Sequence, residues 1–206
     1  MRTAPPPNEP VRGAILAGGQ ARRMGGAPKG LLEVGGERIL DRLVRAFVAA
    51  LGSPPLLVAN APEAASWRPD LRVVPDRRPE GATLGGLYTA VTEAPAPVVV
   101  VAWDMPFVTP DLLRALGRGL DHADVTIPAS DGPRGLEPLC AGYGPATGPA
   151  MAAALDRGDL RAIAFHGAVR VRVLPEEEVR AFGDPARLFF NVNTADDLVR
   201  ANGMLP

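Results

Sequence analysis

The chain has 206 residues, and 47% of them are apolar, which is enough to build one sizeable hydrophobic core. Acidic and basic residues are scattered and leave a formal net charge of −1, which argues against a nucleic-acid-binding surface. No apolar run approaches the ~20 residues that cross a bilayer, and residues 1–10 lack the apolar stretch of a signal peptide. The single cysteine, Cys140, excludes an internal disulfide and a thiolate metal cluster. We therefore expect a cytoplasmic protein that binds neither membrane nor nucleic acid.

Residues 1–10 are rich in proline and are predicted to form a disordered tail, which leaves residues 11–206 as one domain. An apolar run at 11–17 ends at a glycine pair, the pattern of a buried strand that stops at a turn. Apolar pairs then recur between 39 and 51 with the spacing of an amphipathic helix, which ends at Gly52. Further strands are predicted at 56–59, 71–75, 98–103, 125–128, 139–143 and 169–174, and further helices at 84–91, 109–120, 146–155 and from about 194.

Two of these helices carry capping signals. Thr109 precedes Pro110 at the start of one, and Thr194 is followed three residues later by Asp197 at the start of the last. Strands that alternate with helices predict an α/β protein with a mostly parallel sheet covered on both faces. The expected architecture is a single-domain, three-layer α/β/α fold of the Rossmann-like type.

Polar or glycine residues directly follow four predicted strands, at Gly18-Gly19, Asn60, Asp76 and Asp104. Ligands of open α/β sheets bind outside the carboxyl ends of the strands, so these residues are expected to share one site. Asp104 follows the most apolar strand, and its carboxylate needs a cation or hydrogen bonds to offset desolvation. Mg²⁺ held by one or two carboxylates and by substrate phosphates is a common solution. A helix cap or a salt bridge is the alternative for Asp104.

Asp76 and Asn60 carry weaker signals when each is taken alone. Arg77 and Arg78 follow Asp76, so a surface ion pair is the alternative for that carboxylate. Asn60 could instead cap the helix that comes next. The convergence of several strand ends on one edge is what favours a binding site.

The glycine-rich segment 18–36 is the strongest local signal. Its small residues allow backbone N–H groups to approach a phosphate or a base, and Arg22, Arg23 and Lys29 can neutralise a triphosphate. All of the 22 basic residues except Lys29 are arginines, which indicates that a compact ammonium is needed at that position. The spacing matches neither the P-loop nor the dinucleotide fingerprint. The alternative is an ordinary glycine-rich surface loop.

A second group of residues lies further along the chain. Arg134 and Glu137 belong to or follow a loop at 130–135 that could reach a second substrate. Cys140, His122 and His166 lack the context of a metal site or a catalytic triad, and we interpret them as structural.

Taken together, these motifs resemble the molybdenum cofactor guanylyltransferases. In chain order the resemblance is carried by Leu16-Ala17-Gly18-Gly19, Arg22-Arg23-Met24-Gly25, Lys29-Gly30-Leu31-Leu32, Asn60, Asp76, Leu84-Gly85-Gly86-Leu87, Asp104-Met105-Pro106 and Asn191-Val192-Asn193-Thr194. The first motif is shared with wider sugar and cofactor nucleotidyltransferases, and it implies their Rossmann-like nucleotidyltransferase fold. Two stretches depart from the family pattern. The usual Gly-Pro-Leu-Ala-Gly is here Ala82-Thr83-Leu84-Gly85-Gly86, and Trp103 replaces the common cysteine.

The resemblance implies a Mg²⁺-dependent enzyme that transfers GMP from GTP to the phosphate of molybdopterin, with release of pyrophosphate. It implies a nucleotide site formed by Leu16, Ala17, Gly18, Gly19, Gly25, Lys29, Asn60, Asp76, Gly85 and Asp104. It gives catalytic roles to Lys29, Arg22, Arg23 and Asp104, with Asp104 as the metal ligand. The pterin substrate is expected near Arg134, Glu137, Asn191 and Asn193. Transient contacts with molybdenum-insertion proteins or acceptor molybdoenzymes would follow.

The choice of base is a separate inference, because the Leu-Ala-Gly-Gly form resembles GTP users. Three alternatives stay open at this point. The protein could use CTP or a different phosphorylated acceptor such as a sugar phosphate. It could bind nucleotides as a regulator without turnover. It could also be a structural or partner-binding protein, although that reading leaves the polar strand ends unexplained.

Overall fold

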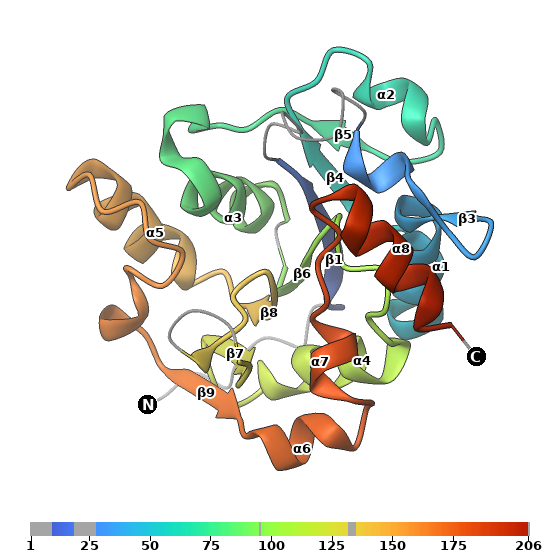
Figure 1. The fold of residues 1–206 in the computed structure, drawn as a ribbon. Coiled ribbons are helices and arrows are strands. Elements are labelled where there is room, and N and C mark those ends of the chain that lie inside the picture. The colour runs from blue at the N-terminus through green and yellow to red at the C-terminus, as the bar shows by residue number, and fades with distance from the viewer. Residues whose placement is uncertain (1–9, 19–27, 95, 132–134, 206) are drawn as a thin grey trace.

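The centre of the protein is a seven-stranded sheet with the strand order β5-β4-β1-β6-β8-β7-β9 (Figure 1). The computed structural model describes residues 10–18, 28–94, 96–131 and 135–205. All seven strands run in the same direction except β8, which is antiparallel to β6 and β7, so the prediction of a mostly parallel sheet is confirmed. The strands are β1 (Arg12–Ala17), β4 (Leu56–Ala59), β5 (Val73–Val74), β6 (Val98–Ala102), β7 (Val125–Pro128), β8 (Cys140–Tyr143) and β9 (Val171–Leu174).

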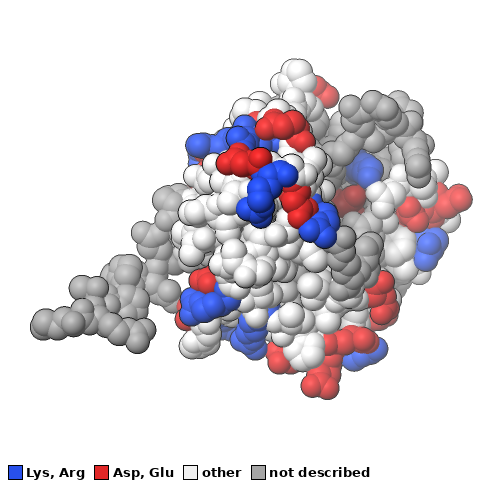
Figure 2. Space-filling view, turned by 90° about the vertical axis from the view of Figure 1, so that its left-hand side faces the viewer, with Lys and Arg blue, Asp and Glu red and all other residues white. Residues whose placement is uncertain are grey.

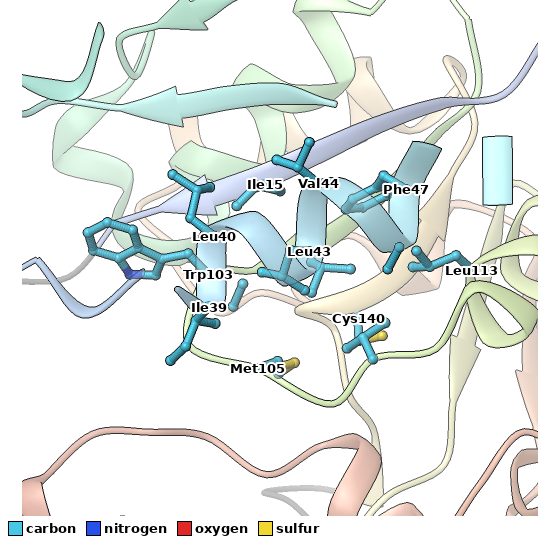
Figure 3. Packing of buried hydrophobic residues seen from close by; sticks show 14 of the residues in the cluster. Ile15, Ile39, Leu40, Leu43, Val44, Phe47, Trp103, Met105, Leu113 and Cys140 are labelled. Carbon is cyan, nitrogen blue, oxygen red and sulfur yellow. The ribbon is translucent and has the colours of Figure 1, made fainter. Parts of the chain in front are cut away.

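Helices cover both faces of this sheet and complete the predicted three layers (Figure 1). Side chains alternate between the two faces of a strand. In β1, Ala14 and Leu16 therefore pack on the side of α3 and α5, whereas Ile15 and Ala17 pack on the side of α1 and α4. Figure 3 shows the core on the α1 side. The helices are α1 (Ile39–Leu51), α2 (Ala64–Trp67), α3 (Ala82–Glu93), α4 (Pro110–Gly119), α5 (Thr147–Asp156), α6 (Glu176–Arg180), α7 (Pro185–Leu188) and α8 (Ala195–Gly203).

Helix α1 shows how the apolar spacing sets the packing. Ile39, Leu43 and Phe47 lie on one side of the helix and are buried against the sheet. Burying side chains of this size stabilises a fold by about 1.5–3 kcal/mol each. The helix ends at Gly52, which has a φ of 73° and donates its N–H to the Val48 carbonyl at 2.9 Å. Glycine adopts this left-handed conformation without strain, so the predicted stop is confirmed.

The two predicted helix starts are also confirmed. The hydroxyl of Thr109 accepts a hydrogen bond from the N–H of Leu112, and Pro110 is the first residue of α4. At α8, the Thr194 hydroxyl accepts from the Asp197 N–H at 3.1 Å, and the Asp197 carboxylate accepts from the Thr194 N–H at 3.0 Å. This reciprocal pair satisfies two N–H groups that a helix end would otherwise leave without partners.

Several short elements differ from the prediction. The strand predicted at 71–75 is reduced to β5, while the helix predicted at 84–91 begins earlier as α3. An antiparallel hairpin of β2 (Glu33–Val34) and β3 (Glu37–Arg38) was not predicted. Its turn consists of Gly35 and Gly36, both with positive φ, as two-residue hairpin turns require. Strands of two residues are too short to show a periodic pattern.

The surface shows mixed charge on the face drawn in Figure 2, where basic and acidic side chains lie next to one another. The described residues drawn on that face do not form a broad basic area. Among the helices in the described part of the chain, none is long and apolar enough to cross a membrane.

Candidate active site

A cavity of about 410 Å³ opens at the edge of the sheet where β1, β4, β5 and β6 end. The four polar strand ends are therefore brought together, because Gly18, Asn60, Asp76 and Asp104 all line this cavity. The other residues that line it are Leu16, Ala17, Val58, Ala59, Pro79, Ala82, Thr83, Gly86, Ala102, Trp103, Leu139, Asn191 and Asn193. Its size is in the range of small-molecule sites in proteins.

Helix α3 forms one wall of the cavity, and its two consecutive glycines have different surroundings. At Gly86 a Cβ atom would lie 3.5 Å from Leu16 Cδ1 and 3.9 Å from Asp76 Oδ1, so this glycine keeps the wall open. At Gly85, which we predicted to bind nucleotide, a Cβ atom would lie 2.2 Å from the carbonyl oxygen of Arg78. Gly85 is not among the residues that line the cavity, and its lack of a side chain allows α3 to pack closely on the preceding turn.

Asn60 and Asp76 form a hydrogen-bonded pair at the ends of β4 and β5. The Asn60 side-chain oxygen accepts from the backbone N–H of Asp76 at 2.7 Å, so Asn60 joins two neighbouring strand ends. Thr89 Oγ1 donates to Asp76 Oδ1 at 2.9 Å and accepts from the N–H of Arg77 at 2.9 Å. Burial raises the pKa of Asp76, and hydrogen bonds from Thr89 and Asn60 oppose that shift.

The alternatives for these two residues do not describe the structure. The helix that follows Asn60 is capped at Glu63, so Asn60 is not a helix cap. The guanidinium of Arg77 pairs with Glu93, and that of Arg78 contacts Asp156. Within the described residues, Asp76 is therefore not paired with either of the arginines that follow it. Its carboxylate remains on the wall of the cavity.

Lys29 and Asp104 meet beside the cavity although 75 positions separate them in the chain. Asp104 lines the cavity, whereas Lys29 is not among its lining residues and adjoins it through Asp104 and Asn193. Lys29 Nζ lies 3.4 Å from Asp104 Oδ2 and also donates to the side-chain oxygen of Asn193. Only 14% of the Lys29 side chain and 15% of the Asp104 side chain are exposed. The salt bridge that was the alternative for Asp104 is thus present, but it connects the two residues predicted to act on phosphates.

Backbone hydrogen bonds join the segment that carries Asp104 to the end of β1 and to the segment 191–193. The N–H of Trp103 donates to the Leu16 carbonyl at 3.2 Å, and the Asp104 carbonyl accepts from the N–H of Val192 at 2.9 Å. The second bond brings the segment that contains Asn191 and Asn193 to the cavity. Burial raises the pKa of Asp104, and the positive charge of Lys29 opposes that shift.

The donor set at Asp104 fits a cation that is completed by substrate. Among the described residues, no group of three His, Cys, Asp or Glu side chains could enclose a metal ion. Mg²⁺ usually retains waters and binds through one or two carboxylates together with substrate phosphates. The Asp104 carboxylate, which is 15% exposed and lines the cavity, fits such a partly substrate-bound cation.

Glu137 lies close enough to Asp104 for the two charges to interact, at the start of the segment that leads into β8. Its N–H donates to the Pro128 carbonyl, and its carboxylate accepts from the N–H of Leu139 at 3.2 Å. Burial raises the pKa of Glu137 to about 7, and the charge of Asp104 adds to this effect. Glu137 is not among the residues that line the cavity, but Leu139, two residues later, is.

The residues interpreted as structural stay away from the cavity. Cys140 is fully buried in the core, and burial raises the pKa of its thiol. His166 packs edge-on against Phe165, and neither His166 nor His122 lines the cavity. Five residues with predicted roles lie outside the described residues, namely Gly19, Arg22, Arg23, Gly25 and Arg134.

Sequence reasoning missed some residues of the cavity wall, including Pro79, Ala82, Thr83 and Leu139. Ala82 has a φ of 49°, the only positive φ of a non-glycine residue in the described part of the chain. The structure identifies Ala82 by this backbone angle. The sequence indicated the position only through its departure from the family pattern, in which a glycine is usual. Leu139 had no signal, because only the reversed direction of β8 brings it to this edge.

The sheet is mostly parallel, and its carboxyl edge presents a carboxylate and amides to a cavity, with a lysine from a nearby turn beside the carboxylate. This arrangement is typical of the nucleotidyltransferase class. Comparison with known families makes this specific. The profile described as the MobA-like NTP transferase domain matches residues 13–171. The chain belongs to this family.

Relatives and solved structures agree with that assignment. A probable molybdenum cofactor guanylyltransferase from Pelotomaculum thermopropionicum is 38% identical over 193 residues, which cover 93% of this chain and 92% of the relative. The crystal structure of molybdopterin-guanine dinucleotide biosynthesis protein A from Archaeoglobus fulgidus has a TM-score of 0.79 at 27% identity, covering 94% of this chain and 98% of that one. A Mycobacterium tuberculosis protein crystallised with manganese shares the fold, with a TM-score of 0.63 at 19% identity and coverage of 96% and 100%.

Proposed function

We propose that this protein is a Mg²⁺-dependent molybdenum cofactor guanylyltransferase. It transfers GMP from GTP to the terminal phosphate of molybdopterin, releases pyrophosphate and forms molybdopterin guanine dinucleotide. Support comes from the match to guanylyltransferases over nearly the full length of the chain. The observation that carries the chemistry is the contact of Lys29 with Asp104 at the rim of a cavity whose other walls bear Asn60 and Asp76.

The nucleoside occupies the part of the cavity between the end of β1 and helix α3. There the side chain of Leu16 and the strand end at Ala17 and Gly18 face the base, and Gly86 leaves room beside them. Asn60 and Asp76 are held rigid by their mutual hydrogen bond and by Thr89, so their remaining polar atoms can bind the nucleoside without a large ordering cost.

The phosphates extend from the nucleoside toward Lys29 and Asp104. The molybdopterin phosphate attacks the α-phosphorus of GTP in line, and pyrophosphate leaves, so no covalent intermediate with the protein is needed. Lys29 neutralises phosphate charge, and Arg22 and Arg23 of the glycine-rich segment are proposed to assist it. Asp104 holds the divalent cation. When bound, that cation supplies positive charge against the phosphate oxygens.

The acceptor lies toward Asn191 and Asn193, the cavity residues farthest along the chain. The amide of Asn193 is already oriented by its contact with Lys29, and Asn191 donates to the Phe189 carbonyl at 2.9 Å. Arg134 and Glu137 are proposed to extend this half of the site toward the pterin. A Glu137 carboxyl with a pKa of about 7 can accept a hydrogen bond or, when protonated, donate one.

The test is pyrophosphate release by the full chain with Mg²⁺, GTP and molybdopterin, together with mass spectrometry of the dinucleotide product. The same assay with CTP, or with sugar phosphates as acceptors, provides the matched comparisons. Lys29→Ala serves as the inactive control. Pyrophosphate release only with CTP or only with a sugar phosphate would overturn the proposed substrates. GTP binding in calorimetry without pyrophosphate release would instead identify a nucleotide-binding regulator.

A further inference from the structure

The two tryptophans of the chain stack on each other directly beside the Lys29 turn. The ring centroids of Trp67 in α2 and Trp103 after β6 lie 5.2 Å apart with an angle of 28° between the planes. Trp67 is 7% exposed and Trp103 is 4% exposed. Figure 3 shows the Trp103 indole at one end of the core cluster on the α1 side. A ring pair of this kind is a rigid support, since stacked aromatic rings contribute beyond their buried area.

The indole of Trp103 also lies against the backbone of the turn that carries Lys29. A Cβ atom on Gly30 would be 2.5 Å from Trp103 Cε3 and 3.1 Å from its Cδ2. Gly30 belongs to the short 3-10 turn Lys29–Leu31, and its φ is not positive, so the position requires the absence of a side chain rather than a special backbone conformation. The turn and the indole are therefore in van der Waals contact.

This contact supports both members of the charge pair. Trp103 directly precedes Asp104, and its ring lies against the residue that follows Lys29. The turn itself has few bonds, since Leu31 donates to Pro28 and Leu32 donates to the Lys29 carbonyl. A lysine side chain has four flexible carbons, so the position of its ammonium depends on a fixed backbone.

Hydrogen bonds to the described residues do not explain the indole, because its Nε1 is buried and has no acceptor among them. The contacts that those residues make with Trp103 are ring contacts, namely the stacking on Trp67 and the approach of Gly30. The property of Trp103 on which the turn depends is therefore the size and flatness of its ring.

We propose that Trp103 is a positioning residue, which holds the Lys29 turn so that the ammonium meets the phosphates of the nucleotide. This inference rests on the proposed binding of a nucleoside triphosphate. Shortening the side chain removes the support of the turn, while the nucleoside end of the cavity, at Gly86 and Asn60, is left in place. The proposal therefore predicts that the effect of Trp103 on binding acts through Lys29 and requires the phosphates.

The test compares the affinities of GTP and of guanosine by calorimetry for the wild type, Trp103→Ala, Lys29→Ala and the double variant. We expect Trp103→Ala to weaken GTP binding about tenfold, the order of one charge-assisted hydrogen bond, and to leave guanosine binding unchanged. In the Lys29→Ala background the same substitution should have no further effect on GTP. Trp103→Phe, which keeps a flat ring without the indole N–H, should restore most of the affinity.

Two results would overturn the inference. One is an equal loss of GTP and guanosine affinity in Trp103→Ala, which would mean that the ring supports the whole cavity. The other is a loss for the double variant equal to the product of the two single losses. Thermal unfolding of each variant shows whether it is folded, and Trp103→Leu, which keeps apolar bulk without a flat ring, carries the comparison if Trp103→Ala does not fold. Failure of the proposed function is distinguishable, because wild-type protein would then bind GTP without releasing pyrophosphate.

Discussion

The adjacent glycines of α3 allow a sharp test, because the same substitution should have opposite effects on stability. A methyl group at Gly85 would lie 2.2 Å from the Arg78 carbonyl oxygen, a distance that forces the backbone to move. A methyl group at Gly86 would be 3.5 Å from Leu16 Cδ1, which is ordinary contact on the cavity side. Gly85→Ala should therefore disturb the fold, and Gly86→Ala should disturb only the site.

The magnitudes follow from two opposing contributions. Alanine favours a helix over glycine by about 1 kcal/mol, which both variants gain. Overpacking against a backbone carbonyl costs about 1–3 kcal/mol or more, which only Gly85→Ala incurs. For a domain of this length, 1 kcal/mol corresponds to about 2–4 °C in the melting temperature. We expect Gly86→Ala to melt about 2–4 °C above the wild type and Gly85→Ala to melt below it.

Thermal unfolding followed by circular dichroism measures the first effect, and calorimetry with GTP measures the second. Gly86→Ala should bind GTP about tenfold more weakly despite its higher stability, because its methyl group occupies space beside Leu16 and Asp76. A Gly85→Ala variant as stable as the wild type would refute the packing explanation. Wild-type GTP affinity in Gly86→Ala would show that the nucleotide does not contact this wall.

Three further predictions concern individual residues. Asp104→Ala and Lys29→Ala should each lower the turnover for pyrophosphate release a hundredfold or more, about 2.7 kcal/mol of transition-state stabilisation; near wild-type turnover of Asp104→Ala at limiting Mg²⁺ would exclude its role. Because burial raises the pKa of Glu137 from 4.5 to about 7, the folded state keeps a proton that the unfolded state loses, and the free energy of unfolding falls as the pH rises from 4.5 through 7. Glu137→Gln should remove this part of the pH dependence in chemical unfolding and should be more stable than the wild type at pH 8; an unchanged pH profile would contradict it. Ala82→Gly should raise the free energy of unfolding by about 1 kcal/mol, because a positive φ strains alanine by about 1–3 kcal/mol and glycine offsets part of that relief through its greater unfolded-state freedom; a less stable variant would show that Ala82 is not strained.

The fold could be predicted from the sequence to the extent that apolar spacing encodes it. The buried runs that became β1 and β6 and the stripe of α1 were long enough to identify, and Gly52 and Thr109 marked helix ends by their own local chemistry. The direction of β8 could not be predicted, because a four-residue apolar strand has the same pattern in either orientation. Nor could the two-residue strands of the β2–β3 hairpin be predicted from periodicity.

For the site, the sequence indicated which residues have special roles, but it could not predict which side chains they contact. The single lysine indicated a special position for Lys29, but its contact with Asn193 bridges 164 positions of the chain. For Asn60, a helix cap and a ligand contact remained equal choices in the sequence. The structure excludes the helix cap, because the adjacency of β4 and β5 places the Asn60 side chain on the N–H of Asp76 at the cavity wall, and the ligand contact stays a prediction. Local sequence contains no information on which strands are neighbours.

The reversed strand β8 has a consequence for how this enzyme class can diversify. Strand β6 ends at the cavity edge of the sheet, whereas β8 runs in the opposite direction and begins there. The connection from Ala129 to Leu139 therefore reaches the cavity at Leu139, directly before β8 begins. On the proposed assignment of the site, insertions or deletions in that connection would remodel the acceptor end while β6 and β8 keep their register. The proposed nucleotide end has no such freedom, because its residues close directly onto paired strands and a tightly packed helix.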